Sequence, residues 1–194
     1  MRSIRNMKRI LVDLDETILE FSDPFQKWLG EAHGLFSAYR LKDHHDIPKL
    51  FNIDFQVTMA LVSEFHRSPQ MEYLEPLPCA VSVLPALYKA GYRFIAITAC
   101  LNEIKTVERR KANLRAAFGF DFDEVHCVGL VPSKKEALEL YDSSIWVDDL
   151  YHHAVQGAEL GHKSFLIDRP YNRHANHPDI SRVVDWHEIA EKLL

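Results

Sequence analysis

The sequence has few of the features that mark several large classes of protein. It contains only three cysteines, Cys79, Cys100 and Cys127, at spacings that fit neither a disulfide framework nor a metal-binding cluster. We therefore expect free thiols and a reducing, cytoplasmic environment. No apolar run approaches the roughly 20 residues that a membrane-spanning helix needs, and the basic segment 1–9 lacks the apolar region of a signal peptide. We expect no membrane partner.

Positive charge is also in short supply. The chain has 23 lysines and arginines against 28 acidic residues, which gives a formal net charge of -5. Proteins that bind nucleic-acid polymers usually carry a basic patch, so we expect no such polymer as a partner. A small anionic substrate stays compatible with this charge if a cation neutralises it locally. The sequence leaves open whether the chain forms a homodimer.

The chain has enough apolar residues for one core. Its 194 residues are 47% hydrophobic, which suffices for one compact unit with a small inserted subdomain. Short apolar runs alternate with longer amphipathic segments, and this βαβ order predicts a three-layer α/β/α fold around a parallel sheet. The predicted strands are 9–13, 92–98, 124–130, 144–149 and 163–168, and the predicted helices are 102–118, 133–141 and 151–160.

Polar residues follow the predicted strands. In open α/β sheets, ligands bind beyond the carboxyl ends of the strands, so these side chains are expected to share one site. Asp13 and Asp15 are two residues apart on an extended segment and can address one ligand together. The candidate residues, in chain order, are Asp13, Asp15, Thr98, Lys134, Lys135, Asp148 and Asp149.

The order of these residues resembles that of the haloacid dehalogenase-like (HAD) phosphohydrolase superfamily. The stretch "DLDET" resembles its first motif, "FIAITAC" the second, "PSKKEAL" the third and "IWVDD" the fourth. The four stretches follow one another from residue 13 to residue 149, which makes accidental agreement improbable. The resemblance implies a HAD-like Rossmannoid core and a phosphatase activity that uses Mg²⁺.

The chemistry gives each carboxylate a role. A carboxylate can attack phosphorus and form an aspartyl-phosphate that water then hydrolyses, and we expect Asp13 to be this nucleophile. Asp15 is expected to protonate the departing oxygen and later to take a proton from the attacking water. The resemblance implies that Mg²⁺ is bound by Asp13, Asp148 and the backbone carbonyl of Asp15, with Asp149 as a further ligand or as a partner of one.

The phosphate itself needs hydrogen-bond donors and a cation. Thr98 and Ala99, at the end of the second strand, are expected to contact it, and a lysine is expected to stabilise its charge. Lys134 is the first choice, because the apolar residues 137–138 lie three and four positions later and would pack on the same side of the helix. Lys135 is the alternative and is expected to be solvated.

A long segment separates the first strand from the second. Residues 20–76 have a helical pattern and end among prolines, which indicates a small helical cap inserted after the first motif, with 1–19 and 77–194 forming the catalytic core. Caps of this type cover the site and select the leaving group, so we expect substrate specificity to lie there.

A finer resemblance lies near the C-terminus. The stretches "SFLIDRPYNR" and "RVVDWHEI" resemble the 5'(3')-deoxyribonucleotidase branch, including its phage and bacterial members, and imply a nucleoside monophosphate as the substrate. The sequence departs from some members by having Glu16 where they have glycine, and by a long interval between Thr98 and Lys134. Phe21 and Trp28 of the cap are candidate pocket residues. Asn172 is a third candidate, although holding a loop in place is its favoured role.

Two other classes of function stay open: a different enzyme on the same scaffold, and a binding protein without catalysis. The same scaffold could serve a sugar-phosphate phosphatase, a polynucleotide-end phosphatase or a dehalogenase. The carboxylates at positions 15 and 148–149 favour phosphoryl transfer over dehalogenation, and the net charge disfavours a polynucleotide. A catalytically silent nucleotide-binding protein is less favoured, because every expected reacting group is present.

Overall fold

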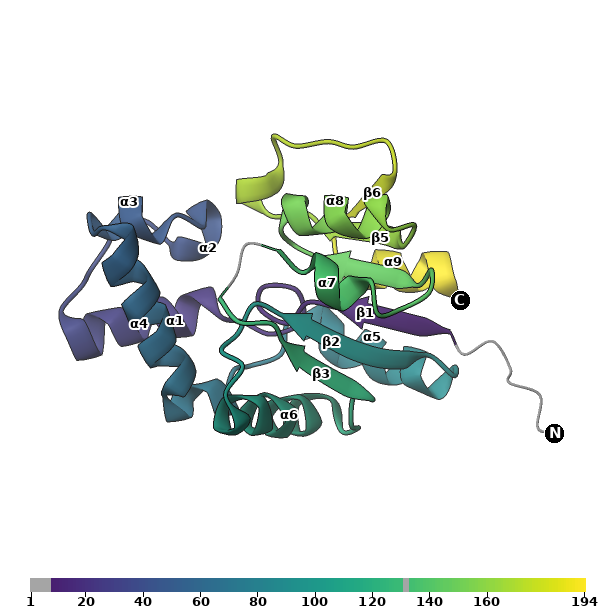
Figure 1. The fold of residues 1–194 in the computed structure, drawn as a ribbon, viewed down its shortest axis with the longest axis horizontal. Helices are drawn as coiled ribbons and strands as arrows, with labels where there is room; N and C mark the ends of the chain where they lie inside the picture. The colour runs from purple at the N-terminus through teal and green to yellow at the C-terminus, as the bar shows by residue number, and fades with distance from the viewer. Residues whose placement is uncertain (1–7, 131–132) are drawn as a thin grey trace.

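A computed structural model describes residues 8–130 and 133–194 of the chain, and its centre is a parallel sheet (Figure 1). Six strands lie in the order β3-β2-β1-β4-β5-β6, and every neighbouring pair is parallel. The parallel α/β prediction is therefore confirmed. Residues 1–7 and Pro132, which opens the "PSKKEAL" segment, lie outside the described residues. The strands are β1 (Arg9–Val12), β2 (Arg93–Thr98), β3 (Glu124–Cys127), β4 (Ile145–Asp148), β5 (Lys163–Ile167) and β6 (Ile180–Val183).

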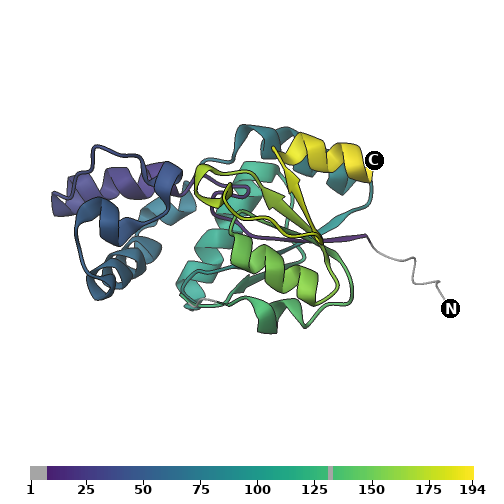
Figure 2. The ribbon, with the colours of Figure 1, turned by 90° about the horizontal axis from the view of Figure 1, so that it is seen from above.

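Helices cover both faces of this sheet (Figure 2). The side chains of β1 show why both faces are buried: Ile10 and Val12 point into one hydrophobic cluster, and Leu11 points into another that includes Trp146. The core helices are α5 (Pro78–Lys89), α6 (Ile104–Phe118), α7 (Lys135–Leu138), α8 (Tyr151–Glu159) and α9 (Trp186–Leu193). Among the described residues, no helix combines the length and the apolar character needed to cross a membrane.

One glycine sets the distance between α8 and the sheet. A Cβ atom on Gly157 would lie 2.3 Å from the Trp146 ring and 2.7 Å from the Ser164 hydroxyl. Only a residue without a side chain allows this approach of helix to strand. The close packing fixes α8, whose N-terminal residues follow the carboxylates at the end of β4.

A group of helices between β1 and α5 stands beside the sheet, on the side to which β2 and β3 point (Figures 1 and 2). Its own core is aromatic: the Phe65 ring lies 5.1 Å from Phe25 and 5.4 Å from Trp28. Ion pairs join the group to α6, one between Arg67 and Glu103 and one between Arg109 and Glu72. The helices are α1 (Ser22–His33), α2 (Leu41–His44), α3 (Ile47–Phe51), α4 (Phe55–Arg67) and the 3-10 helix η1 (Pro69–Glu72).

The elements differ from the sequence-based expectations in three places. The helix expected over 133–141 is only α7, and it begins at Lys135 with Lys134 as its N-cap. The proline-rich passage contains a full helix, α5, with Pro85 inside it. The sheet also has a sixth strand, β6, followed by α9; the sequence pattern did not reveal either, because Ser181 and Arg182 interrupt the apolar run.

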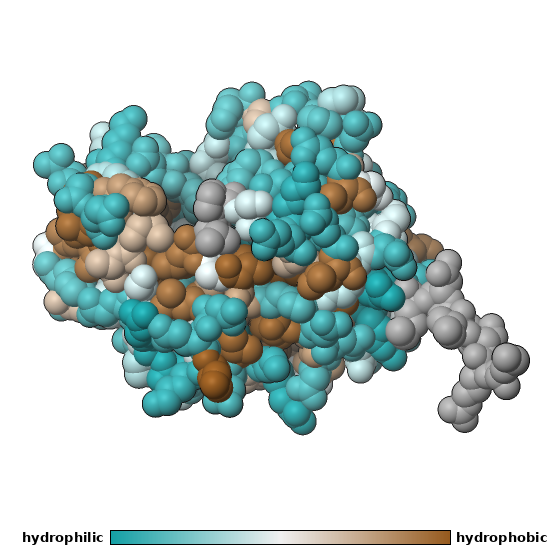
Figure 3. Space-filling view, viewed as in Figure 1, coloured by the Kyte–Doolittle hydropathy of each residue, from teal (hydrophilic) through white to brown (hydrophobic). Residues whose placement is uncertain are grey.

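The β3 edge of the sheet is open. Figure 3 shows hydrophobic residues gathered in a band over β3 and the adjoining parts of α6 and α7. A cleft of about 720 Å³ lies there, lined in part by Val107, Val125, Val128 and Leu140. None of the carboxylates singled out by the sequence lines this cleft.

Candidate active site

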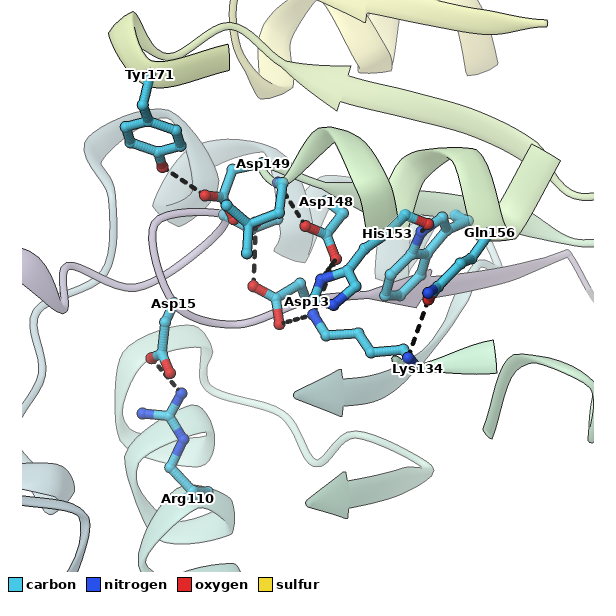
Figure 4. A network of polar contacts seen from close by, with 12 residues as sticks. Asp13, Asp15, Arg110, Lys134, Asp148, Asp149, His153, Gln156 and Tyr171 are labelled. Carbon is cyan, nitrogen blue, oxygen red and sulfur yellow. Dashed lines mark hydrogen bonds and ion pairs between the residues drawn. The ribbon is translucent and has the colours of Figure 1, made fainter. Parts of the chain in front are cut away.

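Three carboxylates meet at the carboxyl ends of the two central strands (Figure 4). Asp13 comes directly after β1, and its N–H donates to Val147 of β4 at 2.9 Å, which continues the pairing of the strands. Asp148 ends β4, and Asp149 follows it. All three side chains are buried, and they offer carboxylate oxygens within 4.8 Å of one another. The strand ends therefore bring together the acidic residues that the sequence separates by more than a hundred positions.

A buried lysine lies among these carboxylates. Lys134 Nζ donates to Asp13 Oδ1 at 2.5 Å and to Asp148 Oδ2 at 2.9 Å, and the residue is 2% exposed. Its backbone N–H donates to Gln156 of α8 at 3.0 Å, which holds the start of α7 against the site. Lys135, the alternative, is exposed. Of the two lysines, only Lys134 reaches the cluster.

The cluster carries more negative than positive charge, and the pKa values reflect this. The pKa of Asp13 is raised to about 6, because burial and the neighbouring charges of Asp148 and Asp15 together outweigh the opposing charge of Lys134. Burial and the neighbours Asp148 and Asp13 also raise the pKa of Asp149 well above its ordinary value. The pKa of Asp148 is lowered although burial opposes this, because Lys134 and His153 contact it. Two of three buried carboxyls thus favour the protonated form at low pH.

This donor set fits a hard divalent cation. Mg²⁺ prefers a few carboxylate oxygens and retains several waters, and three buried oxygen donors with one compensating lysine leave negative charge for it to neutralise. A bound cation would favour the ionised forms of Asp13 and Asp149 and so oppose the burial that raises their pKa values.

The segment after β5 supports the carboxylates from outside. Asn172 Nδ2 donates to the backbone oxygens of Asp149 and Ile167, both at 2.8 Å, and the Tyr171 hydroxyl donates to Asp149 Oδ2. Thr17 Oγ1 donates to the other oxygen of Asp149 at 2.9 Å. The 3-10 helix η2 (Pro170–Asn172) therefore fixes the orientation of Asp149. Asn172 has the loop-holding role and does not line the cavity at the carboxylates.

Glu16 ties the same loop to the inserted helices. Its backbone lies in the left-handed region, with φ of 58°, where glycine is the least strained residue. Its side-chain Oε1 accepts hydrogen bonds from the N–H groups of Phe21 at 3.0 Å and Ser22 at 2.7 Å, at the start of α1. Its carbonyl oxygen accepts from Arg169. Glu16 thus caps the first inserted helix.

A cavity of about 200 Å³ opens over the carboxylates. Thr98 lines it with a hydroxyl that is buried and has no hydrogen-bond partner among the described residues, and Ala99 lies beside it. The inserted helices supply apolar side chains to the same cavity. The lining comprises Asp13, Asp15, Glu16, Phe21, Ser22, Leu41, His45, Ile47, Val62, His66, Thr98, Ala99, Lys134, Asp149, Leu150 and His153.

Two of the three candidate pocket residues lie elsewhere. Phe21 lines the cavity, and its contact with a substrate stays a prediction. Trp28 does not, because its ring packs against Phe25 and Phe65 in the aromatic core of the inserted helices. Asn172 is 2% exposed, and its side-chain amide donates hydrogen bonds to the backbone oxygens of Asp149 and Ile167.

Sequence reasoning gave no role to two residues that contact the site. His153 is 2% exposed, and its Nδ1 lies 3.4 Å from Asp148 Oδ2. Arg110 is completely buried in α6, and its Nη2 donates to Asp15 Oδ1 at 2.5 Å. Helical spacing held a signal for Arg110, since it lies four residues before Leu114 and therefore on the inward face of α6.

Comparison with solved structures gives the class of fold. A predicted phosphatase from Clostridium acetobutylicum superposes with a TM-score of 0.65 at 14% identity, over 96% of this chain and 98% of that chain. A haloacid dehalogenase-like hydrolase from Streptococcus pneumoniae gives 0.64 at 14% identity, over 97% and 99%. CbbY from Rhodobacter sphaeroides, solved with phosphate, gives 0.62 at 17% identity, over 94% and 96%. The protein has the HAD-like α/β fold.

Sequence comparison places the chain more narrowly. It is 32% identical over 193 residues to an uncharacterised 32.4 kDa protein from the Gp30-rIII intergenic region of Enterobacteria phage T4. The match covers 95% of this chain and 69% of the phage protein. The chain belongs to the family of that phage protein. No protein-family model matches it.

Proposed function

We propose that the protein is a phosphomonoesterase that acts on nucleoside monophosphates through a phosphoenzyme on Asp13. The observation that carries this proposal is the position of the Asp13 carboxylate, at the floor of a cavity and between Lys134, Asp148 and Asp149. A carboxylate at such a place can attack phosphorus, because the neighbouring lysine offsets the charge that accumulates on the phosphoryl oxygens.

The proposed phosphate site consists of Thr98, Ala99 and Lys134, which line the cavity. Thr98 lines the cavity, and its buried hydroxyl has no hydrogen-bond partner among the described residues, so a phosphate oxygen would satisfy it. Ala99 is the neighbouring contact, and Lys134 stabilises the charge of the transferring group. The same three residues that the sequence singled out for phosphate are thereby the proposed phosphate site.

Mg²⁺ is the proposed cofactor. Asp13, Asp148 and Asp149 would hold it with their side chains, and Asp15 with its backbone carbonyl. When bound, Mg²⁺ neutralises charge between the nucleophile and the phosphate and orients both.

Asp15 is the proposed acid and base. In the first half-reaction the phosphorus–oxygen bond to the leaving group breaks, a bond from phosphorus to Asp13 forms, and Asp15 gives its proton to the leaving oxygen. In the second, a water attacks the aspartyl-phosphate, Asp15 takes a proton from it, and inorganic phosphate leaves. The products are an alcohol and phosphate, and both carboxylates return to their starting states.

The inserted helices are the proposed cap, with 20–76 as its bounds and 1–19 and 77–194 as the core. Their contribution to the cavity is largely apolar and includes the Phe21 ring, which could lie against a nucleobase. The choice of a nucleotide over a sugar phosphate rests on this wall and on the resemblance of the C-terminal stretches to deoxyribonucleotidases. The buried carboxylate cluster supports phosphoryl transfer rather than dehalogenation, since a halide leaving group needs no divalent cation.

The test is phosphate release from a panel of ribo- and deoxyribonucleoside monophosphates and sugar phosphates, with Mg²⁺ or with EDTA. We expect turnover of nucleotides that needs Mg²⁺ and is lost in Asp13→Asn. Turnover of sugar phosphates alone would keep the mechanism and overturn the nucleotide assignment. Absence of turnover on the whole panel would contradict the proposed function and favour a nucleotide-binding protein without catalysis.

A further inference from the structure

A fully buried arginine reaches the proposed acid and base from below the site (Figure 4). Arg110 lies on α6 with no exposed surface, and its Nη2 donates to Asp15 Oδ1 at 2.5 Å. Its Nε and Nη1 are also buried and have no hydrogen-bond partner among the described residues. Within the part of the chain that the structure describes, the single hydrogen bond of this guanidinium is therefore with Asp15.

Stability alone does not account for such a residue. Taking a guanidinium out of water is costly, and unpaired buried N–H groups add to that cost. Apolar residues of similar volume often pack as well as a buried ion pair or better, and the neighbouring residues Leu114 and Phe118 of α6 are apolar and buried. Packing therefore does not explain why an arginine occupies this position.

The geometry at Asp15 explains the presence of Arg110. Its side chain is 20% exposed and lines the same cavity as Asp13. Arg110 binds Oδ1, and no described residue donates a hydrogen bond to Oδ2. A carboxyl held by one oxygen from below presents the other oxygen to the cavity, where a leaving group would depart. Without the arginine the side chain would be free to turn among rotamers.

We propose that Arg110 is a positioning residue that holds Asp15 in the orientation for proton transfer. This inference rests on the proposed phosphatase function and adds a residue to it. It carries a consequence that a purely structural role does not. Proton donation matters most when the leaving oxygen is strongly basic, as in an alkyl phosphate, and little when the leaving group is a stable phenolate, as in p-nitrophenyl phosphate.

The experiment compares kcat/KM for these two kinds of ester, because kcat/KM reports the half-reaction in which the leaving group departs. The variants are Arg110→Met, the conservative Arg110→Lys, and Arg109→Met as a matched control on the same helix. The alkyl ester is the one that the wild type hydrolyses best in the panel above. Thermal unfolding of each variant is recorded beside the kinetics, and Arg110→Gln replaces Arg110→Met if the latter does not fold.

We expect Arg110→Met to lower kcat/KM for the alkyl ester about 10- to 100-fold more than for p-nitrophenyl phosphate, a part of the usual contribution of a general acid. Arg110→Lys should recover part of the loss, and Arg109→Met should leave the ratio of the two esters unchanged. In an Asp15→Asn background, Arg110→Met should not change the ratio further, because the group that it positions is gone.

An equal loss on both esters, or a further change of the ratio in the Asp15→Asn background, would overturn the inference while leaving the phosphatase intact. Absence of turnover by the wild type on both esters would instead contradict the proposed function, and with it the role of Arg110. The two failures are therefore distinguishable.

Discussion

The core side of the cavity is charged, whereas the side formed by the inserted helices is mostly apolar. Asp13 and Asp149 face the cavity from the strand ends and Lys134 from the start of α7. Leu41, Ile47 and Val62 face it from the inserted helices. The two sides are also held differently: buried hydrogen bonds fix the charged side, and aromatic packing and exposed ion pairs hold the helices. Under the proposed function, this division would place the chemistry on the core side and the selectivity on the side of the inserted helices.

Substitutions on the two sides of the cavity should therefore affect turnover in different ways. A change at Asp13 or Lys134 should affect all substrates alike, because these groups act on the phosphate that every phosphomonoester presents. A change at Asp15 or Arg110 should instead follow the basicity of the leaving oxygen. A change on the apolar side should affect substrates unequally, because it contacts only the leaving group.

The largest effect is expected from Lys134→Met. This variant leaves Asp13 and Asp148 without their cation, and we expect turnover to fall about 10²- to 10³-fold on every substrate, the usual loss when one charge-stabilising donor is removed. Phosphate release under saturating Mg²⁺ measures it. The matched control is Lys135→Met, at the exposed neighbouring position, which should stay close to the wild type. Equal losses of turnover in Lys134→Met and Lys135→Met, or a loss in Lys134→Met confined to some substrates, would contradict the assignment of the chemistry to the charged side.

A smaller and selective effect is expected from Val62→Ala on the apolar side. Removing two methyl groups from the wall should change the ratio of kcat/KM between a large and a small leaving group by about 10-fold, as the loss of methyl-sized contacts does in apolar pockets. Val57→Ala, on the same helix α4 but 42% exposed, is the control. A uniform loss on all substrates in Val62→Ala would show that the helices take part in the chemistry itself.

The smallest effect is expected on stability, at Glu16, which joins the loop after β1 to the start of α1. Glu16→Ala removes the oxygen that caps α1 and keeps the strained backbone, so we expect a loss of about 1–2 kcal/mol in the free energy of unfolding. Glu16→Gly removes the same oxygen but relieves the strain, and should be about 1 kcal/mol more stable than Glu16→Ala. Urea unfolding of the three proteins measures both differences. An alanine variant as stable as the glycine variant would remove the argument for strain at this position.

Much of the charged side could be predicted from the sequence. The strands are short apolar runs that end in carboxylates, and parallel order brings such ends together, so local patterns located Asp13, Thr98 and the pair 148–149. The expectation that Lys134 faces inward agrees with its 2% exposure and with the packing of the residues after it. Its contact with phosphate stays a prediction.

The apolar side of the cavity could not be predicted from the sequence, because it depends on tertiary packing. Which aromatic residue of a small helical group faces a cavity depends on how the helices pack, and this separates Phe21 from Trp28 although both belong to the same stretch. The ion pair between Arg110 and Asp15 joins residues 95 positions apart. Helical spacing places Arg110 on the inward face of α6, but no local pattern shows that its partner is Asp15. The strand β6 was missed because only a tertiary contact with β5 stabilises so polar a segment.

The most direct test of the central claim is detection of the phosphoenzyme. The protein would be mixed with p-nitrophenyl phosphate and Mg²⁺, quenched in acid and digested, and its peptides examined by mass spectrometry. Asp15→Asn, which should slow the hydrolysis of the intermediate, would be used to accumulate it. We predict one phosphoryl group on the peptide that contains Asp13, absent with EDTA and absent in Asp13→Asn. Release of phosphate by the wild type with no phosphoryl group on that peptide in any sample would contradict nucleophilic attack by Asp13.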